Sequence, residues 1–309
     1  MAKIGNFDVL IPLTGTCLFF DQTVASLEES SLLPDKIIVV DDGIKNRRLL
    51  QMLENDSKFL VLKNTGYGIA DALNTGIRAS RNEFVARIDG DDLVTKDRFM
   101  KQYKFLSSHL DTIVIGSRLT YIDIHSKSIG LSNHKSGLLN EYKEFYKKCL
   151  VAHPSVMLRK SFVISVGGYR NLFTYQGLTL SEDFDLWLRL SKIGKIENFS
   201  NPLTLYRIHE NQVTKKSAPA IDLATFLIGF LSKNNLYSHE VIEFENSSKL
   251  QNYLESIYPM MSFLEKLHTN ALFVIFNYKH EFNNKKTPKL LQVQYIFFKI
   301  LNYVLRKFF

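Results

Sequence analysis

The stretch "FVARIDGDDLV" (Phe84–Val94) sets an apolar run directly before three aspartates, Asp89, Asp91 and Asp92. The run Phe84–Ile88 predicts a buried strand, because short apolar runs are typical of strands covered on both faces. Carboxylates so close together repel one another, and a folded protein holds them with a cation, with hydrogen-bond donors or in open water. The stretch therefore predicts a buried strand followed by a turn whose carboxylates need a cation, hydrogen-bond donors or solvent.

Similar strands come before it in the chain. "FDVLIP" (Phe7–Pro12), "KIIVVDDG" (Lys36–Gly43) and "FLVLKN" (Phe59–Asn64) predict short strands, and the segments Val24–Leu32 and Tyr67–Ser80 have the apolar spacing of helices. Strands that alternate with helices predict an α/β fold with a mostly parallel, Rossmann-like sheet flanked by helices.

Polar residues collect where these strands end. Asp41, Asp42, Asn64 and the aspartates of 89–92 all follow a predicted strand. Ligands of such sheets bind outside the carboxyl ends of the strands, so we expect these side chains to share one site.

The later part of the chain is less regular. Strands are predicted at Thr112–Asp123 and Ser155–Ser161, a helix at Glu182–Gly194, and a short strand within Pro202–Thr214 that carries Arg207 and His209. After about residue 215 the pattern is mainly helical. We therefore expect one domain over residues 1–214 and a helical extension over residues 215–309.

Composition limits the kind of protein. The chain has 309 residues, 45% of them hydrophobic, so it can bury a sizeable core. Its two cysteines, Cys17 and Cys149, are far apart and predict neither a disulfide framework nor a metal site, which favours a reducing cytosol. The first residues lack the pattern of a secretory signal, and no run of roughly 18 apolar residues predicts a membrane span. The net charge of +8 favours an anionic partner.

The aspartate turn allows two interpretations. It can hold a divalent cation through hard oxygen ligands, or it can be a turn with side-chain caps before a helix that begins near Thr95. A third pattern, "NTGYGIADALNTG" (Asn64–Gly76), is a truncated dinucleotide fingerprint, with Asp89 about 20 residues further on. That fingerprint leaves Gly90 to Asp92 unexplained.

Two further segments carry polar groups that a buried element rarely needs. "SEDFDLWLRL" (Ser181–Leu190) places Glu182, Asp183 and Asp185 in the first turn of an otherwise apolar helix. The helix dipole favours one acid there, typically by less than about 1 kcal/mol, but explains three less well. "YRIH" (Tyr206–His209) adds an arginine and a histidine.

Taken together, these motifs resemble the family 2 glycosyltransferases with the GT-A fold. The similarity covers Phe7 to Thr214 and follows a specific order: VVDDG, N-x-G-x-G-x-A-x-A-L-N-x-G-I, A-R-I-D-G-D-D, H-P-S-V-M-x-R-K, G-G-Y, E-D-F-D-L-W-L-R-L and Y-R-I-H. Members that build bacterial surface polysaccharides, such as O-antigen or capsule, are most similar.

The resemblance implies an enzyme that moves a sugar from a nucleoside diphosphate donor, a UDP-sugar, to a hydroxyl of a lipid-linked sugar acceptor, with inversion. A donor-binding half would span about residues 1–115 and an acceptor-binding half about residues 116–214. Asp183 would be the catalytic base. Asp89, Asp91 and His209 would hold a divalent cation, Mn²⁺ or Mg²⁺.

The resemblance also implies two sets of contact residues. The donor would touch Pro12, Thr14, Asp41, Asp42, Gly68, Asn74, Asp89 and Gly90. The acceptor or the diphosphate would touch His153, Glu182, Trp187 and Arg207.

The segment Lys285–Phe309 lies beyond the resemblance and has six basic residues but no acidic one. As a basic amphipathic helix it would bind the cytoplasmic membrane surface, which would make the protein peripheral on the inner face; packing on the core is the alternative. Nucleic acid is not an expected partner, because the basic residues alternate with large aliphatic ones.

Two rival functions remain at this point. A nucleotidyltransferase usually opens with a glycine-rich, basic loop, whereas "LTGTCLFFDQ" has one glycine and no basic residue. An inactive nucleotide-sugar-binding protein of the same fold would not need Asp89, Asp91 and Asp183 together.

Overall fold

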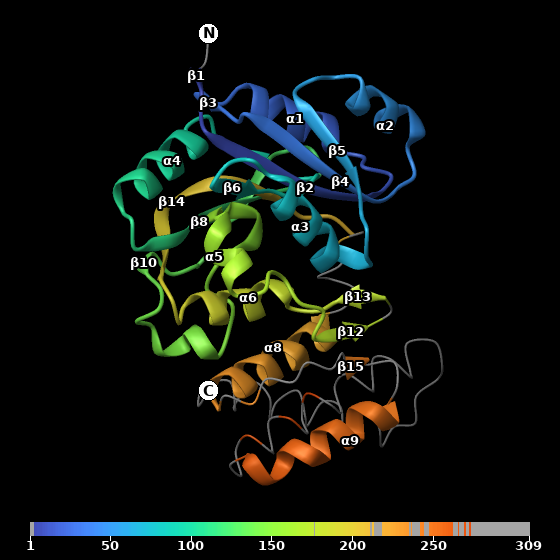
Figure 1. The fold of residues 1–309 in the computed structure, drawn as a ribbon, viewed down its shortest axis with the longest axis vertical. Coiled ribbons are helices and arrows are strands. Elements are labelled where there is room, and N and C mark those ends of the chain that lie inside the picture. Colours follow the sequence, from blue (N-terminus) through green and yellow to red (C-terminus); the bar gives the residue numbers. More distant parts are fainter. Residues whose placement is uncertain are drawn as a thin grey trace. The chain divides into compact units, whose positions relative to one another are not determined.

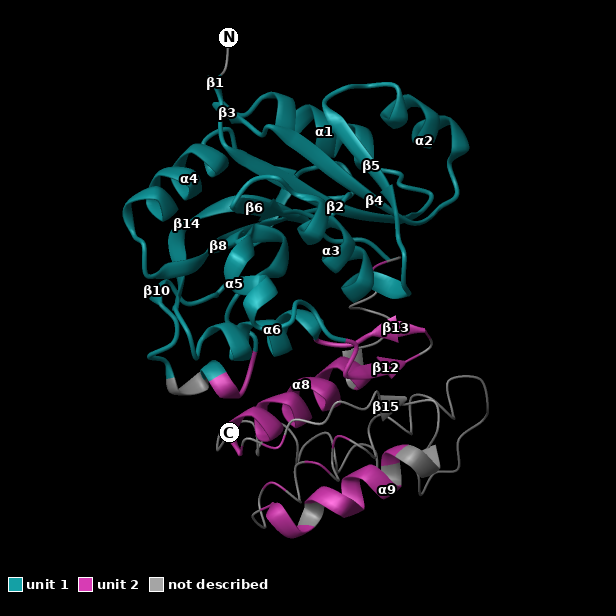
Figure 2. Cartoon of the chain, viewed as in Figure 1, with its two compact units in different colours: residues 1–145, 149–170, 182–210 teal, residues 146–148, 171–181, 211–309 magenta. Residues whose placement is uncertain are grey.

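The computed structural model describes residues 3–175, 177–210, 212, 218–234, 236, 242–243, 247–261, 265, 269 and 272 (Figure 1). Contacts divide the chain into two compact units, shown in Figure 2. The first unit comprises residues 1–145, 149–170 and 182–210, and the second comprises residues 146–148, 171–181 and 211–309.

The first unit is built on one large sheet. Its parallel part has the order β6-β2-β4-β5 and consists of β2 (Phe7–Gly15), β4 (Lys36–Ile44), β5 (Phe59–Lys63) and β6 (Phe84–Arg87). All four strands overlap the segments predicted from the sequence, so the parallel part of the sheet is confirmed.

Beyond β6 the sheet becomes mixed. β11 (Met157–Arg159) runs antiparallel between β6 and β8 (Thr112–Ile122), and β8 pairs in parallel with β14 (Lys195–Arg207). Three short antiparallel strands complete it: β7 (Leu93–Val94), β9 (Ser128–Leu131) and β10 (Gly137–Leu138).

Helices cover both faces of this sheet. α1 (Phe20–Glu28), α2 (Arg47–Glu54) and α4 (Arg98–Ser108) lie on one face, and α3 (Gly68–Ala79) lies on the other with α5 (Lys160–Ser165) and α6 (Glu182–Leu190) (Figure 1). Neighbouring side chains of a strand point to opposite faces, so alternate residues of β2 serve the two layers.

The two layers of the core meet at β2. Val9 and Ile11 belong to the buried cluster that includes residues of α1, α2 and α4. Leu10 points the other way, toward α3, where a Cβ on Gly76 would come within 2.1 Å of the Leu10 Cδ1 atom. The absence of a side chain on Gly76 therefore sets how closely α3 packs on β2.

The first helix ends earlier than its predicted range of Val24–Leu32. α1 stops at Glu28, and Leu32 instead belongs to β3 (Leu32–Leu33), which pairs with β1 (Lys3–Ile4). The first unit also contains the 3₁₀ turn η2 (His153–Ser155), and a further 3₁₀ turn, η1 (Lys143–Tyr146), ends at the first residue of the second unit.

The second unit contains a small sheet and helices. Its strands are β12 (Phe173–Tyr175), β13 (Leu178–Thr179) and β15 (Ile242–Glu243), and its helices are α8 (Ala218–Lys233), α9 (Ser247–Ile257) and the 3₁₀ turn η3 (Tyr258–Met260). Among the residues described, no helix combines the length and the apolar character needed to cross a membrane. The predicted tail, 285–309, lies outside the described residues.

Candidate functional site

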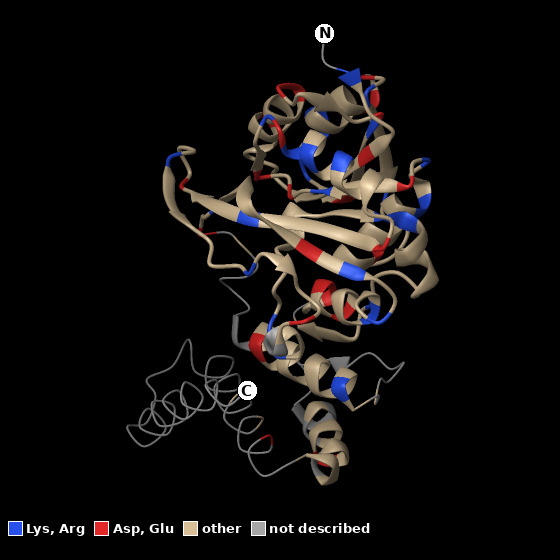
Figure 3. Cartoon of the chain, turned by 90° about the vertical axis from the view of Figure 1, so that its left-hand side faces the viewer, with Lys and Arg blue, Asp and Glu red and all other residues tan. Residues whose placement is uncertain are grey.

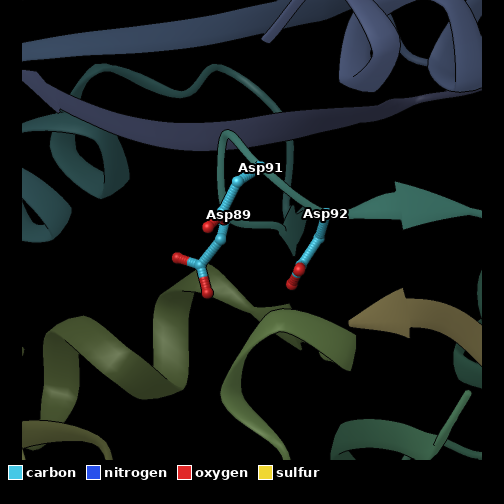
Figure 4. A group of neighbouring side chains, drawn as sticks. All are labelled: Asp89, Asp91 and Asp92. Carbon is cyan, nitrogen blue, oxygen red and sulfur yellow. The ribbon is translucent and has the colours of Figure 1, made fainter. Parts of the chain in front are cut away.

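The three aspartates lie on the turn between β6 and β7, at the carboxyl end of a buried strand (Figure 4). One carboxylate oxygen from each of Asp89, Asp91 and Asp92 lies within 4.8 Å of the others. Gly90 lets this turn approach β2, since a Cβ there would come within 2.2 Å of the Leu13 Cδ2 atom. The fold therefore brings Asp89 and Asp91 together and adds Asp92, which the family resemblance did not name as a ligand.

Asp92 is the buried member of this acidic cluster. Its Oδ1 accepts a hydrogen bond of 2.9 Å from the main-chain N–H of Arg207, while its buried Oδ2 has no partner among the described residues. Burial raises the pKa of Asp92 well above its usual range, and the charges of Asp89 and Asp91 raise it further. A buried oxygen without a donor costs about 1–3 kcal/mol. A hard cation bound by the three carboxylates would supply the missing partner, so these residues fit a divalent cation.

Arg87 forms the main ion pair of the cluster. Its side chain is buried, and its Nη1 and Nη2 atoms lie 2.9 and 2.5 Å from the two carboxylate oxygens of Asp89. Burial raises the pKa of Asp89, whereas the Arg87 guanidinium lowers it. The same guanidinium lowers the pKa values of Glu182 and Asp183, so it lies between the cluster and the acids that begin α6. The sequence motif contained Arg87 but gave it no role.

His209 joins the cluster from the far end of the unit's sequence. Its Nε2 atom lies 2.8 Å from Oδ2 of Asp91, and its ring centroid lies 5.6 Å from that of Phe19. β14 ends at Arg207, so His209 follows the strand rather than lying on it as predicted. The fold therefore places His209 beside Asp91, and its role as a metal ligand stays a prediction.

Arg207 makes several contacts within the protein, and its contact with the acceptor or the diphosphate stays a prediction. The residue is fully buried. Its Nε donates to the main-chain oxygen of Asp91 at 2.8 Å, and its Nη2 donates to Oε1 of Gln22 at 2.8 Å. Its guanidinium also lies 4.4 Å from the centre of the Phe19 ring. Through these contacts Arg207 holds the turn that carries the acidic cluster in place.

The second group of acids lies at the start of α6. Asp183 accepts the main-chain N–H of Phe184 at 2.7 Å through Oδ1, and the Cys149 thiol lies 3.7 Å from its Oδ2. Burial raises the pKa of Asp183, and it raises the pKa of Glu182 to about 8. The charge of Asp183 also helps to raise the pKa of Asp89, so the two acidic groups lie within electrostatic range of each other.

His153 is a buried residue that lies close to Glu182 and Tyr169. Its Nε2 atom lies 2.9 Å from the Tyr169 hydroxyl, and its Nδ1 atom lies 3.8 Å from Oε1 of Glu182. Burial lowers the pKa of His153 well below its usual range, and the positive charge of Arg87 lowers it further, so the imidazole is neutral. Trp187 is fully buried and packs edge-on against His153, with ring centroids 5.7 Å apart. Trp187 thus packs against the residues that support the site, and its contact with the acceptor or the diphosphate stays a prediction.

The predicted donor contacts collect at the carboxyl ends of β2, β4 and β5. Thr14 Oγ1 donates to the main-chain oxygen of Asp42 at 3.0 Å, and Asn64 Nδ2 donates to Oδ1 of Asp42 at 2.6 Å. Asp41 Oδ1 accepts the N–H groups of residues 43 and 44 at 2.9 and 2.6 Å. Pro12 lies on the same edge, on β2 opposite residue 40 of β4. Gly68 begins α3 with φ +71°, a conformation that favours glycine.

Asn74 is engaged elsewhere. Its Nδ2 donates to the main-chain oxygen of Tyr169 at 2.8 Å, and its Oδ1 accepts the Tyr169 N–H at 2.8 Å. Both ends of the amide are therefore bonded to the chain that carries the Tyr169 hydroxyl. Asn74 therefore holds the Gly-Gly-Tyr turn that supports His153, and its contact with the donor stays a prediction.

Bacterial glycosyltransferases are similar to this chain in sequence. It is 31% identical over 208 residues to the amylovoran biosynthesis glycosyltransferase AmsE of Erwinia amylovora. This alignment covers 63% of this chain and 73% of AmsE. It is 25% identical over 190 residues to the UDP-Gal:alpha-D-GlcNAc-diphosphoundecaprenol beta-1,3-galactosyltransferase of Escherichia coli, covering 60% and 67%.

Solved structures of S. aureus TarS share the fold. The complex of TarS 1-349 with UDP-GlcNAc aligns with a TM-score of 0.59 at 14% identity, over 98% of this chain and 92% of that one. The complex with UDP aligns with a TM-score of 0.55 at 12% identity, over 98% and 89%. The expected GT-A fold is thus confirmed.

A family model adds the assignment. The model described as Glycosyl transferase family 2 matches residues 8–167, which include all of β2 except Phe7, the polar residues at the ends of β2, β4 and β5, and the whole acidic cluster. This match favours the transferase over the nucleotidyltransferase considered from the sequence. With its fold and its acidic cluster, the chain belongs to glycosyl transferase family 2.

Proposed function

We propose that the protein is an inverting glycosyltransferase that moves a sugar from a UDP-sugar to a hydroxyl of a lipid-linked glycan in bacterial surface polysaccharide synthesis. The observation that carries this proposal is the shared site of two acidic groups, the cluster of Asp89, Asp91 and Asp92 and the acids that begin α6, with Arg87 between them.

Asp89 and Asp91, together with Asp92, would hold Mn²⁺ or Mg²⁺, and His209 bonds to Asp91 beside them. When bound, the cation would act as a Lewis acid that offsets the charge on the departing diphosphate. The protein's own contribution is to hold the carboxylates in register, through Arg87 on Asp89 and Arg207 on the turn.

Asp183 would take the proton of the acceptor hydroxyl. The hydroxyl oxygen then bonds to the anomeric carbon as the carbon–oxygen bond to the diphosphate breaks, and the nucleoside diphosphate leaves with the electron pair. One displacement inverts the configuration and needs no protein nucleophile. The raised pKa of Asp183, caused by burial, makes it a stronger base than an exposed carboxylate.

The names of the relatives support the choice of substrates. UDP-sugars are named for the E. coli galactosyltransferase and for the TarS complex, and a diphosphoundecaprenol acceptor is named for the former. Asp41, Asp42 and Thr14 lie on the edge where we place the uridine. We place donor binding in residues 1–115, acceptor binding in residues 116–214 and a helical extension in residues 215–309.

A cytoplasmic, peripheral location follows from the proposed acceptor. The tail 285–309 would attach to the inner face of the membrane through its basic and aliphatic residues. Nucleic acid is not a proposed partner: in the view of Figure 3 the lysines and arginines of the first unit are interspersed with acids and form no continuous basic stripe.

The test is the variant Asp183→Asn. Loss of a general base typically costs about 10²–10⁴-fold in rate, so transfer should fall by this range while calorimetric binding of UDP with Mn²⁺ stays unchanged. Asp111→Asn makes the same change at an exposed position and should keep full activity. Normal turnover of Asp183→Asn would remove Asp183 as the base.

A further inference from the structure

The β8–β9 hairpin exposes an unusual set of side chains. Its strands pair antiparallel, with Thr120 opposite Leu131, and β9 pairs with β8 alone among the described strands. Ile124, Ile129 and Leu131 are 49%, 56% and 65% exposed. Single exposed aliphatic residues are ordinary, but three within eight positions of one hairpin indicate a contact surface.

The charge of this segment has one sign. Residues 124–135 contain Lys127, Lys135 and two histidines but no aspartate or glutamate. The acid just before them, Asp123, accepts the N–H groups of His125 and Lys127, both at 2.9 Å, with its Oδ1. Exposed aliphatic side chains flanked by cations match the interface of an anionic bilayer, where apolar burial and electrostatic attraction act together.

The hairpin is also tied to the acidic cluster. Arg207 Nη1 donates to the main-chain oxygens of Asp123 and Ile124 at 3.0 and 3.3 Å and lies 3.1 Å from the Ser126 hydroxyl. The same guanidinium donates through Nε to the main-chain oxygen of Asp91. Arg207 thus contacts both the main chain at the exposed Ile124 and the turn that carries the acidic cluster. A surface that binds the hairpin therefore lies next to the acidic cluster.

We propose that the β8–β9 hairpin docks on an anionic phospholipid bilayer. Ile124, Ile129 and Leu131 enter the headgroup region, and Lys127 and Lys135 lie against the lipid phosphates. This surface is separate from the predicted tail. It deepens the proposed function, on which it rests for its purpose, because it presents the acidic cluster to the membrane that carries a lipid-linked acceptor.

Tryptophan reporters test the docking directly. Ile129→Trp and Leu131→Trp, made in the full chain, are mixed with vesicles of phosphatidylglycerol and brominated phosphatidylcholine in equal parts. The native Trp187 is buried and gives a constant background. The added tryptophans should lose emission as the bromines quench them. Leu110→Trp, at a position 77% exposed between α4 and β8, is the matched control and should keep its emission.

A charge test uses the same vesicles. Lys127→Glu with Lys135→Glu should weaken cosedimentation about tenfold or more, because each basic residue near an anionic surface adds appreciably to binding. Lys101→Glu with Lys104→Glu makes the same change on α4 and should have little effect.

Four results would overturn the docking. In the reporter experiment these are no quenching of the tryptophans at residues 129 and 131, quenching at residue 110 equal to theirs, or a tryptophan signal that depends on protein concentration without lipid. In the charge experiment it is an equal weakening of cosedimentation by both pairs of lysine substitutions. The dependence on protein concentration would show that a second copy covers the hairpin. UDP binding is measured in parallel, since its loss with docking intact would count against the proposed function alone.

Discussion

At the residue scale, the three carboxylates of the cluster have different surroundings. Asp89 is paired with Arg87, Asp91 with His209, and Asp92 keeps one buried oxygen without a partner among the described residues. The resemblance to the family implied Asp89 and Asp91 as metal ligands. It could not reveal the burial of Asp92, because its donor, Arg207, lies 115 positions along the chain.

Asp92→Asn should change stability in opposite directions with and without metal. In EDTA the variant should be more stable than the wild type, because a neutral amide replaces a carboxyl group whose ionised form is disfavoured by burial and by the charges of Asp89 and Asp91. With Mn²⁺ it should gain less stability, because a ligand charge is lost. Urea unfolding under both conditions measures this, with Asp111→Asn as the control. A variant that is less stable in EDTA and gains as much from Mn²⁺ would contradict the assignment.

Glu182 should make stability depend on pH. Its pKa rises from 4.5 to about 8 on folding because the side chain is buried. Between these values the folded state binds more protons than the unfolded state, so stability is greatest at the low end and falls as the pH rises. The slope for one proton is at most about 1.4 kcal/mol per pH unit.

The variant Glu182→Gln should flatten this dependence. Urea unfolding in EDTA between pH 5.5 and pH 8 gives the slope for both proteins, and Glu29→Gln, at an exposed position after α1, should keep the wild-type slope. An unchanged slope in Glu182→Gln would show that the carboxyl group is already ionised in the folded protein.

At the scale of elements, local pattern predicted the parallel strands better than it predicted β14. We expected a short strand that begins near Pro202, whereas β14 runs from Lys195 to Arg207. The segment "ENFSNP" (Glu197–Pro202) has little strand propensity, and its strand geometry comes from pairing with β8, with register shifts on both sides of Pro202. Pairing with β8 therefore determines the length of β14, which local propensity does not predict.

The contact between α3 and β2 gives a prediction in which propensity and packing have opposite signs. In an exposed helix, Gly→Ala stabilises by about 1 kcal/mol. At Gly76 the new Cβ would meet the Leu10 Cδ1 atom at 2.1 Å, so Gly76→Ala should instead destabilise, by about 1–3 kcal/mol. Urea unfolding measures the sign. Arg78→Ala, on the exposed side of the same helix, should change stability little. Stabilisation by Gly76→Ala would mean that the helix moves away freely.

At the scale of the whole molecule, the order of motifs was more informative than any one of them. The alternation of strands and helices predicted the α/β class, and the full series of motifs predicted the family that the comparisons show. The motifs could not predict which groups contact residues such as Asn74 and Trp187, because those contacts depend on tertiary neighbours: Tyr169 lies 95 positions from Asn74. The boundary near residue 214 and the role of the tail stay predictions.

Ligand binding should stabilise the whole chain in a way that separates the cluster from the base. A ligand that binds only the folded state at about 100 times its Kd adds about 2.7 kcal/mol. UDP with Mn²⁺ at that level should therefore raise the unfolding free energy of the wild type by this amount, and EDTA should remove most of the gain. Asp183→Asn should keep the full gain, since the base does not hold the diphosphate. Asp91→Asn should lose most of it, since its carboxylate is one of the three that we propose to hold the cation. Equal stabilisation of all three proteins by UDP in EDTA would mean that the nucleotide binds without the cation, and the acidic cluster would then need another role.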